Sequence, residues 1–320
     1  MIRRPVVLCP IDFSDACGGA VRYAAAIAEY FQSELVIATV TDPLLNDVVT
    51  MTVGEGHLGR ESARELERFY QETFARGPAP LVSPRLECAV GNPALEILAM
   101  ATRAGADLIV MSSRGGSGVR KMFFGSTAER VLRETTVPVL ITPPDNGEPA
   151  HFIDAGKTVR RVVAAVDLSD ASVPQARVAW EIAKAVDVPL VLLHVVEPVR
   201  LHWRGLRAIP SVASERRDRA ERRLDSIANI AGSAGRVEAL VVLGEPSEEI
   251  AKVVHDRDAG LIVLGLHASP VRGPRMGSVT YRVLCLSHVP VLALPPTPTG
   301  GTTPLFDRRA VGTRERTAIS

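Results

Sequence analysis

The sequence is poor in the features that mark several common classes of protein. Aromatic residues make up 4% of its 320 residues, which leaves few side chains on which the bases of single-stranded nucleic acid could stack. The formal net charge is only +1, so charge offers no general attraction for nucleic acid or for an anionic membrane. The longest apolar runs, such as LVIATV, are far too short to span a bilayer. We therefore expect neither nucleic acid nor a membrane as a partner.

Targeting and disulfide signals are also missing. The N-terminal segment, MIRRPVVLCPIDF, has no long apolar region followed by a small-residue cleavage site, as a signal peptide would have. The four cysteines form no CxxC pair and have no regular spacing (Cys9, Cys17, Cys88, Cys285). Cysteines scattered in this way are typical of free thiols in a reducing compartment. We predict a cytoplasmic protein.

What the sequence does contain is a long internal repeat. Six segments of the first half return in the same order, and at nearly constant spacing, in the second half. The pairs are VVLCPIDFSDA (6–16) and VVAAVDLSDA (162–171), ELVIATVTDP (34–43) and PLVLLHVVEP (189–198), ECAVGNPALEI (87–97) and LVVLGEPSEEI (240–250), ADLIVMSS (106–113) and AGLIVLGL (259–266), FGSTAERVL (124–132) and MGSVTYRVL (276–284), and TTVPVLITPP (135–144) and SHVPVLALPP (287–296). Chance does not keep six segments in register, so the chain is a duplicated domain.

Each half alternates short apolar runs with amphipathic stretches of helical length. The runs are apolar at every position, which predicts strands buried on both faces of a parallel sheet. The helical stretches cover residues 16–31, 59–76, 93–104 and 126–134 in the first half and 173–186, 211–231, 246–257 and 278–286 in the second. Ser126 and Glu129 match a capping box at one helix start. The pattern predicts two tandem, doubly wound α/β domains with open, Rossmann-like parallel sheets.

Composition suggests the domain boundaries. We predict a first domain over residues 1–144, a polar, turn-rich linker over 145–160 and a second domain over 161–296. The tail, 297–320, lacks periodicity and is predicted to be disordered. The segment 211–231 mixes arginine with acidic residues, which favours a solvated helix face over a basic binding surface.

A glycine-rich segment, SSRGGSGVRKMFFGST (112–127), is the strongest candidate for a functional site. It directly follows an apolar run, and ligands of open parallel sheets bind at the carboxyl ends of strands. Its second part, Gly125 with Ser126 and Thr127, begins a predicted helix, whose free N–H groups suit an anion. The P-loop motif GxxxxGK[ST] does not occur in the chain. From these residues alone, a phosphate site and a plain glycine-rich turn both remain open.

The duplicated pattern resembles the universal stress protein family, as a tandem member, over nearly the whole chain except the tail. The similarity lies in the opening PIDFSDA (10–16), the turn at Gly91-Asn92-Pro93 and the closing strand VPVLIT (137–142). In that family the last strand of one domain pairs with its equivalent across a two-fold axis. The resemblance therefore implies that VPVLIT and its second copy, VPVLAL, join the two halves as an internal pseudo-dimer. Further homodimerisation of the whole chain stays open.

The resemblance also implies an ATP site in the first half. ATP-binding members carry Gly, two residues, Gly, nine residues, Gly, and then Ser or Thr. Gly115, Gly125 and Ser126 match this motif in spacing and identity, whereas Ser112 replaces the first glycine. The implied ligand is ATP, alone or with Mg²⁺. The implied contacts are Pro10, Ile11, Asp12, Val40, Met111, Ser112, Arg114, Gly115, Gly125, Ser126 and Thr127.

Two of these assignments have alternatives that the residues leave open. The resemblance puts Asp12 near the adenine or ribose, but an aspartate at that position can also cap the loop that follows it. It puts Val40 in the base pocket, but a valine at the end of a strand can also be a plain core residue.

The second half departs further from the motif. Its loop, GLHASPVRGPRMGSVT (265–280), restores the first glycine but has Ala268 in place of the second, with eight residues rather than nine before Gly277. Two prolines in the loop each remove an N–H that could face a phosphate. We predict that the second half binds ATP weakly or not at all.

No constellation of catalytic residues stands out. The seven histidines are scattered without metal-ligand spacing, and no paired carboxylates adjoin the glycine-rich loop to hold Mg²⁺ as in kinases. The resemblance implies a stress-response regulator that acts through nucleotide occupancy and an unknown protein partner, and that is not an enzyme beyond slow ATP hydrolysis. Two alternatives are a nucleotide-independent scaffold of the same fold and an adenylyl-transfer enzyme.

Overall fold

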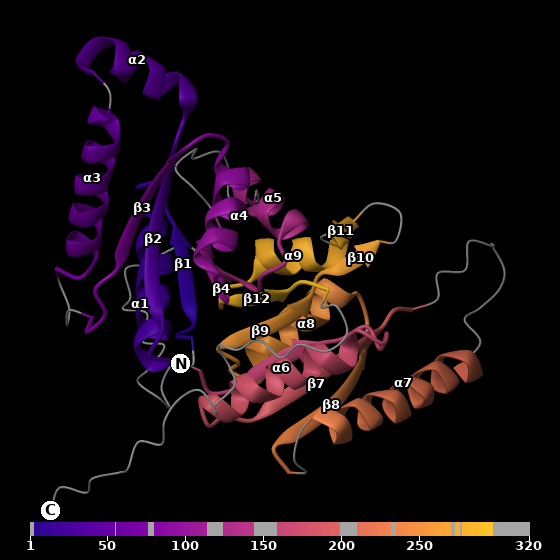
Figure 1. Cartoon of the computed structure of the whole chain (residues 1–320). Coiled ribbons are helices and arrows are strands. Elements are labelled where there is room, and N and C mark those ends of the chain that lie inside the picture. Colours follow the sequence, from indigo (N-terminus) through magenta and orange to yellow (C-terminus); the bar gives the residue numbers. More distant parts are fainter. Residues whose placement is uncertain are drawn as a thin grey trace, which may run out of the picture.

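The computed structural model describes residues 3–54, 56–75, 80–113, 124–143, 159–198, 210–231, 235–269, 273–275 and 277–296. Strands and helices alternate through both halves of the chain. In Figure 1 the first half, coloured indigo to magenta, lies at the upper left, and the second half, rose to yellow, lies at the lower right.

The two halves share one order of elements, except that two helices follow β2 where one follows β7, and that the second half adds a short hairpin after β9. The first half contains β1 (Val6–Pro10), α1 (Cys17–Tyr30), β2 (Glu34–Thr41), α2 (Pro43–Val53), α3 (His57–Thr73), β3 (Arg85–Val90), α4 (Pro93–Ala104), β4 (Leu108–Ser112), α5 (Ser126–Glu134) and β5 (Val139–Thr142). The second half contains β6 (Val162–Ala165), α6 (Ser172–Ala185), β7 (Leu190–Val196), α7 (Pro210–Ala231), β8 (Val237–Leu243), α8 (Pro246–Asp256), β9 (Leu261–Gly265), β10 (His267–Ser269), β11 (Gly273–Arg275), α9 (Ser278–Leu286) and β12 (Val291–Leu294).

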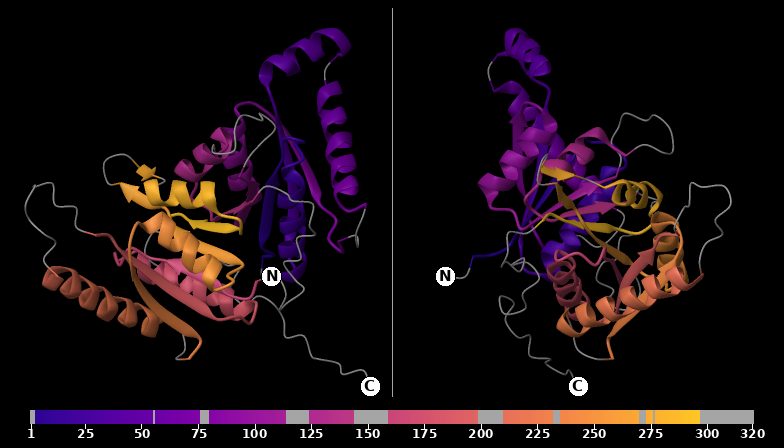
Figure 2. Two further views of the ribbon diagram at one scale, coloured as in Figure 1. Left: turned by 180° about the vertical axis from the view of Figure 1, so that it is seen from behind. Right: turned by 90° about the vertical axis from the view of Figure 1, so that its right-hand side faces the viewer.

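One sheet runs through both halves of the described chain. Its strand order is β3-β2-β1-β4-β5-β12-β9-β6-β7-β8, so that each half repeats the other outward from the centre. Neighbouring strands are parallel within each half, and β5 and β12 are antiparallel, with Leu140 opposite Leu292. Figure 2 shows the yellow strand β12 lying between the two halves. The predicted fold class and the predicted pairing of the last strands are both confirmed.

Helices cover both faces of this sheet. Side chains of β1 alternate between two cores: Val7 packs with residues of α1, such as Ala24, whereas Leu8 packs with residues of α4 and α5, such as Met100 and Leu132. The second half repeats this division, since Val162 belongs to the first core and Val163 to the second. Strands buried on both faces explain why the apolar runs of the sequence do not alternate with polar residues.

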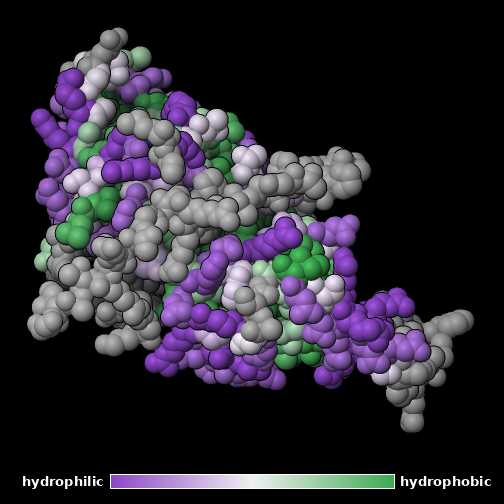
Figure 3. Space-filling model, turned by 60° about the horizontal axis from the view of Figure 1, so that its bottom comes forward, coloured by the Kyte–Doolittle hydropathy of each residue, from purple (hydrophilic) through white to green (hydrophobic). Residues whose placement is uncertain are grey.

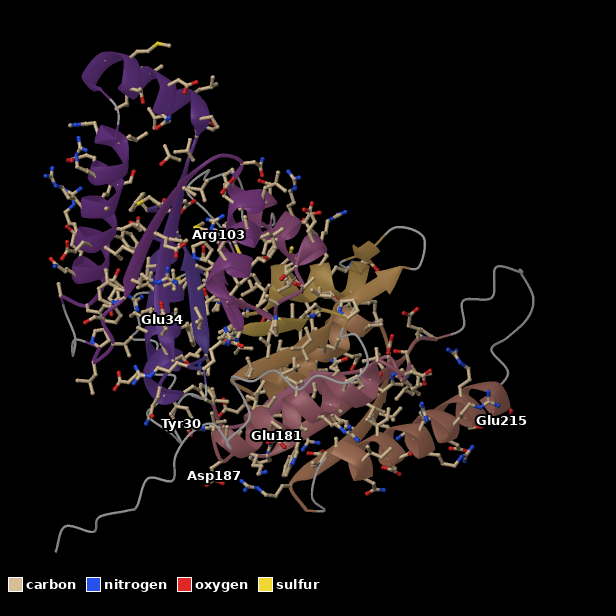
Figure 4. All side chains as sticks on the ribbon, viewed as in Figure 1. Tyr30, Glu34, Arg103, Glu181, Asp187 and Glu215 are labelled. Carbon is tan, nitrogen blue, oxygen red and sulfur yellow. The ribbon has the colours of Figure 1, made fainter. Side chains whose placement is uncertain are left out.

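The two domains also touch outside the central strands. On one face of the sheet, Tyr30 at the end of α1 donates a hydrogen bond to the carbonyl oxygen of Ala185 at the end of α6, and Figure 4 shows Tyr30 beside this helix. On the other face, the rings of Phe124 and Tyr281 meet edge to face, with centroids 6.4 Å apart. Phe124 precedes Gly125, the N-cap of α5, so the second domain makes contact next to the start of that helix.

Helix α7 agrees with the prediction of a solvated face. Arg217 and Glu221 form an ion pair along it at 2.7 Å, and their side chains are 50% and 44% exposed. Figure 3 shows mainly hydrophilic side chains at the lower right of the molecule, where α7 lies. Within the described ranges, no helix combines the length and the apolar character needed to cross a membrane. The predicted tail, 297–320, lies outside the described residues.

Candidate functional site

A cavity of about 260 Å³ opens at the carboxyl ends of β1, β2 and β4. Its lining is Pro10, Ile11, Asp12, Cys17, Val40, Pro93, Ile97, Met111, Ser112, Gly125, Ser126, Thr127 and Ala128. Nine of the eleven residues predicted from the sequence are in this set. The other two, Arg114 and Gly115, lie outside the described residues. The strand ends therefore bring together residues that are more than a hundred positions apart in the chain.

The loop after β1 is organised around the carboxylate of Asp12. Its Oδ1 atom accepts hydrogen bonds from the backbone N–H of Ser14 at 3.1 Å, from the Ser14 hydroxyl at 2.6 Å and from the Cys17 thiol at 3.1 Å. Phe13 between them has a φ of +61°, so the chain turns sharply here. Asp12 thus caps the loop, as one of its two alternatives expected, and it also lines the cavity.

Burial determines the state of the thiol beside this carboxylate. Cys17 is 3% exposed, and burial raises the pKa of its thiol. The thiol therefore stays protonated at neutral pH and donates a hydrogen bond to Asp12. The Ser112 hydroxyl oxygen lies 3.8 Å from the same sulfur. Ser112, the departure from the family motif, is therefore part of the lining next to Asp12 and Cys17.

The end of β2 supplies the apolar side of the cavity. The hydroxyl of Thr39 donates to the carbonyl oxygen of Ile11 at 3.1 Å and so ties β2 to the loop after β1. Val40, the next residue, is half-buried, packs with the core on the α4 side and lines the cavity. Core packing, one of its two alternatives, is therefore confirmed, and its place in a base pocket stays a prediction.

The start of α5 forms the opposite end of the cavity. The backbone N–H of Gly125 donates to the carbonyl oxygen of Ser113 at 3.1 Å, which holds the start of the helix against the end of β4. The capping box predicted at Ser126 and Glu129 is wrong: the N-cap is Gly125, and no side chain caps the helix. Glycine has no side chain to accept from the first-turn N–H groups, so these donors stay available to an anion.

Four lining residues were not predicted. Cys17 lies in α1 and Ala128 in α5, and each of these helices directly follows a predicted segment. Pro93 and Ile97 lie in α4. A signal for Pro93 is present in the sequence, since the Gly91-Asn92-Pro93 turn is one of the segments that resemble the family. In the structure Asn92 caps α4 by accepting from the N–H of Leu95 at 3.3 Å.

The second domain has a cavity of about 220 Å³ at the equivalent strand ends. Its lining is Ala165, Val166, Asp167, Gln175, Leu193, His194, Val195, Glu197, Pro246, Ile250, Leu264, Gly265, Val279 and Thr280. Gly277 and Ser278, which correspond to Gly125 and Ser126, are not among them. The predicted degenerate loop contains the short antiparallel hairpin of β10 and β11 instead, and β11 lies against α5 of the first domain.

Metal ligands do not cluster in the part of the chain that the structure describes. No group of three or more histidine, cysteine, aspartate or glutamate side chains there could hold a metal ion.

Comparison with known proteins gives one consistent family. The model of the universal stress protein family matches residues 4–143 and again residues 158–295. The universal stress protein YxiE of Bacillus subtilis is 34% identical over 146 residues, which cover 42% of this chain and 96% of that protein. A universal stress protein of Mycobacterium tuberculosis, Rv2623, is 25% identical over 300 residues, which cover 89% of this chain and 95% of that protein.

A solved structure supports the same arrangement of two domains. The crystal structure of a universal stress protein from Archaeoglobus fulgidus is 22% identical and superimposes with a TM-score of 0.60. The match covers 91% of this chain and 96% of that one. At this identity the likeness concerns the fold.

Proposed function

The chain belongs to the universal stress protein family as a tandem member, and from this premise we propose that the cavity of its first domain binds ATP. The observation that carries the proposal is the meeting of Asp12, Val40 and Ser112 with the uncapped start of α5 around one cavity. Each of these features was expected from the sequence for a nucleotide site, except that the helix start lacks a side-chain cap.

The chemistry of the lining fits a nucleotide. Val40, Ile97 and Met111 offer apolar contacts suited to a base. The N–H groups at the start of α5, with the hydroxyls of Ser126 and Thr127, suit the phosphates, because a helix N-terminus attracts negative charge. When bound, the nucleotide would supply the negative charge that this end of the cavity is built to accept.

We propose that occupancy of this site, rather than turnover of ATP, is what the protein uses. The carboxylate of Asp12 accepts three hydrogen bonds from its own loop. Its role as a loop cap argues against a general base that activates water. The regulatory output would then pass to a protein partner through the surface around the cavity.

Calorimetric titration of ATP into the full chain tests the proposal, with one substitution in each domain. Gly125→Asp puts a carboxylate at the start of α5, where aspartate is a favourable N-cap residue, so the fold is kept while the phosphate donors are occupied. The matched control is Gly277→Asp at the equivalent N-cap of α9.

We expect one ATP site per chain, weakened at least about 30-fold by Gly125→Asp, since a like charge near the phosphates costs roughly 2 kcal/mol or more. Gly277→Asp should leave the affinity unchanged. Absence of heat and of a thermal shift at millimolar ATP would favour the nucleotide-independent scaffold. Equal weakening by both variants would also contradict a site in the first domain.

A further inference from the structure

The cavity of the second domain is lined by polar side chains that have no counterpart in the lining of the first cavity. Ten of its lining residues occupy positions equivalent to lining residues of the first cavity, among them Asp167 for Asp12 and Val195 for Val40. Gln175, His194 and Glu197 are additional. Their hydrogen bonds define what kind of ligand the cavity accepts.

Gln175 comes from α6 and reaches across the ends of two strands. It is 8% exposed, and its Nε2 atom donates to the carbonyl oxygens of Ala165 at 2.9 Å and Val263 at 3.3 Å. Both partners are acceptors, so the orientation of the amide is determined. The Oε1 atom is left as an acceptor at the cavity, and no donor from the described residues reaches it.

Gly265 is explained by this side chain. A Cβ atom at Gly265 would lie 3.0 Å from Oε1 of Gln175, closer than side chains normally approach. In the first domain Ala20 stands at the position of Gln175 and Ser112 at that of Gly265. There the smaller residue is on the helix and the larger one is on the strand. The glycine at the first position of the ATP motif in the second domain therefore makes room for Gln175.

His194 presents a second acceptor. Its Nδ1 atom lies 2.8 Å from the carbonyl oxygen of Val166, which can only accept, so Nδ1 carries a proton and donates it. In the neutral ring Nε2 is then an acceptor. Thr39 makes the same bond to Ile11 in the first domain, but its hydroxyl is too short to present a further group.

Carboxylates complete the set of acceptors. Asp167 caps its loop by accepting from the N–H of Ser169 and the hydroxyl of Ser172, both at 2.9 Å, and Glu197 lies at the end of β7. Arg216 donates to the backbone carbonyl oxygen of Glu197 at 2.9 Å. Of the residues at the start of α9, Val279 and Thr280 line this cavity, whereas Gly277 and Ser278 do not.

We propose that the second cavity binds a small, phosphate-free organic cation, an amine, amidine or guanidine carried on an apolar group. Its N–H groups would meet the acceptors of Gln175, His194 and Glu197, and its apolar part would lie against Val195, Ile250 and Leu264. Phosphates are disfavoured because two carboxylates, Asp167 and Glu197, line this cavity, against one, Asp12, in the first.

Three probes of one shape test this inference: benzamidine is a cation, benzamide is neutral and benzoate is an anion. Methyl NMR of the full chain reports each cavity separately, because Ile250 lines the second and Ile97 occupies the equivalent position in the first. We expect benzamidine to shift the Ile250 methyl signal saturably without moving that of Ile97. Benzamide should bind more weakly, and benzoate should shift neither signal.

Two variants link binding to the named acceptors. Glu197→Gln should weaken benzamidine about tenfold, the effect of losing one charge-assisted hydrogen bond. Gln175→Ala should weaken it too. Glu181→Gln is the control, because it removes the same charge from the outer face of α6, where Figure 4 shows the residue, and it should change nothing.

The inference is overturned if benzoate binds as well as benzamidine, if Ile250 does not respond to benzamidine, or if Glu197→Gln leaves the affinity unchanged. ATP added to the same sample distinguishes this site from the one proposed in the first domain. ATP should shift the methyl signal of Ile97 and not that of Ile250. If ATP shifts neither signal, the proposed ATP site is contradicted, but the benzamidine result still stands.

Discussion

The two domains share the bonds that build a cavity and differ in the groups that line it. Cys17 and Ser172 both donate to the aspartate after the first strand of their domain. Thr39 and His194 both bond to the carbonyl oxygen before that aspartate. Bonds of this kind hold strand ends together in either copy, so duplication preserves them. Ligand chemistry instead depends on few residues, such as the start of α5 and Gln175, and these are free to diverge.

The largest expected difference between the copies concerns a buried carboxylate. Asp107 accepts from the N–H of Val6 at 2.8 Å and from Arg3 at 2.7 Å, and glycine stands at its position in the second domain. Asp107→Ala leaves the buried Val6 N–H without its acceptor, so we expect a loss of about 2–3 kcal/mol in the free energy of unfolding. Urea denaturation measures this loss. Arg160→Ala, which breaks an exposed ion pair with Asp258, should cost at most about 0.5 kcal/mol.

The next prediction moves one residue between the domains. Gly265→Ser gives the second domain the serine of the first and crowds Oε1 of Gln175, which its two hydrogen bonds hold in place. We expect a loss of about 1 kcal/mol in stability. Combined with Gln175→Ala, the same substitution should cost almost nothing, because the crowded atom is gone. Additive effects in the double-mutant cycle would contradict the steric explanation.

A third exchange concerns ATP. Thr127→Val gives the first domain the residue found at position 279 and removes one hydroxyl from the cavity. We expect ATP affinity to fall about five- to tenfold in calorimetry, as for the loss of one hydrogen bond. The reverse change, Val279→Thr, should not create an ATP site in the second domain. A second site appearing in that variant would mean that the difference between the copies is smaller than we infer.

The smallest effect is expected where the copies are most alike. Cys17→Ser introduces the residue of the second domain, and its hydroxyl can donate to Asp12 as Ser172 does to Asp167. We expect stability to change by less than about 0.5 kcal/mol and ATP affinity by less than about twofold. A large loss of affinity would show that the thiol has a role in binding that the hydroxyl cannot replace.

Some elements were not predictable from the sequence. Helix α2 was missed, and its exposed Leu44, Val48 and Met51 show why: its apolar residues are not those of a core-facing helix, so periodicity did not reveal it. The capping box at Ser126 was wrong because the chain enters α5 through Gly125, an arrangement that depends on the bond from Gly125 to Ser113. Local patterns could not reveal either feature.

The repeat and the uniformly apolar strands were enough to determine the duplicated parallel fold, because burial on both faces admits few other arrangements. The joining of the two halves through their last strands was implied by the resemblance to the family. Strand ends pointed to the glycine-rich segment as a candidate site, and the resemblance to the family supplied the other lining residues, such as Asp12 and Val40. Only the tertiary structure decided what the second cavity accepts. Gln175 lies on α6 outside the repeated segments, and it becomes a ligand group only because folding carries it over Gly265 and turns its Nε2 atom towards two backbone carbonyls.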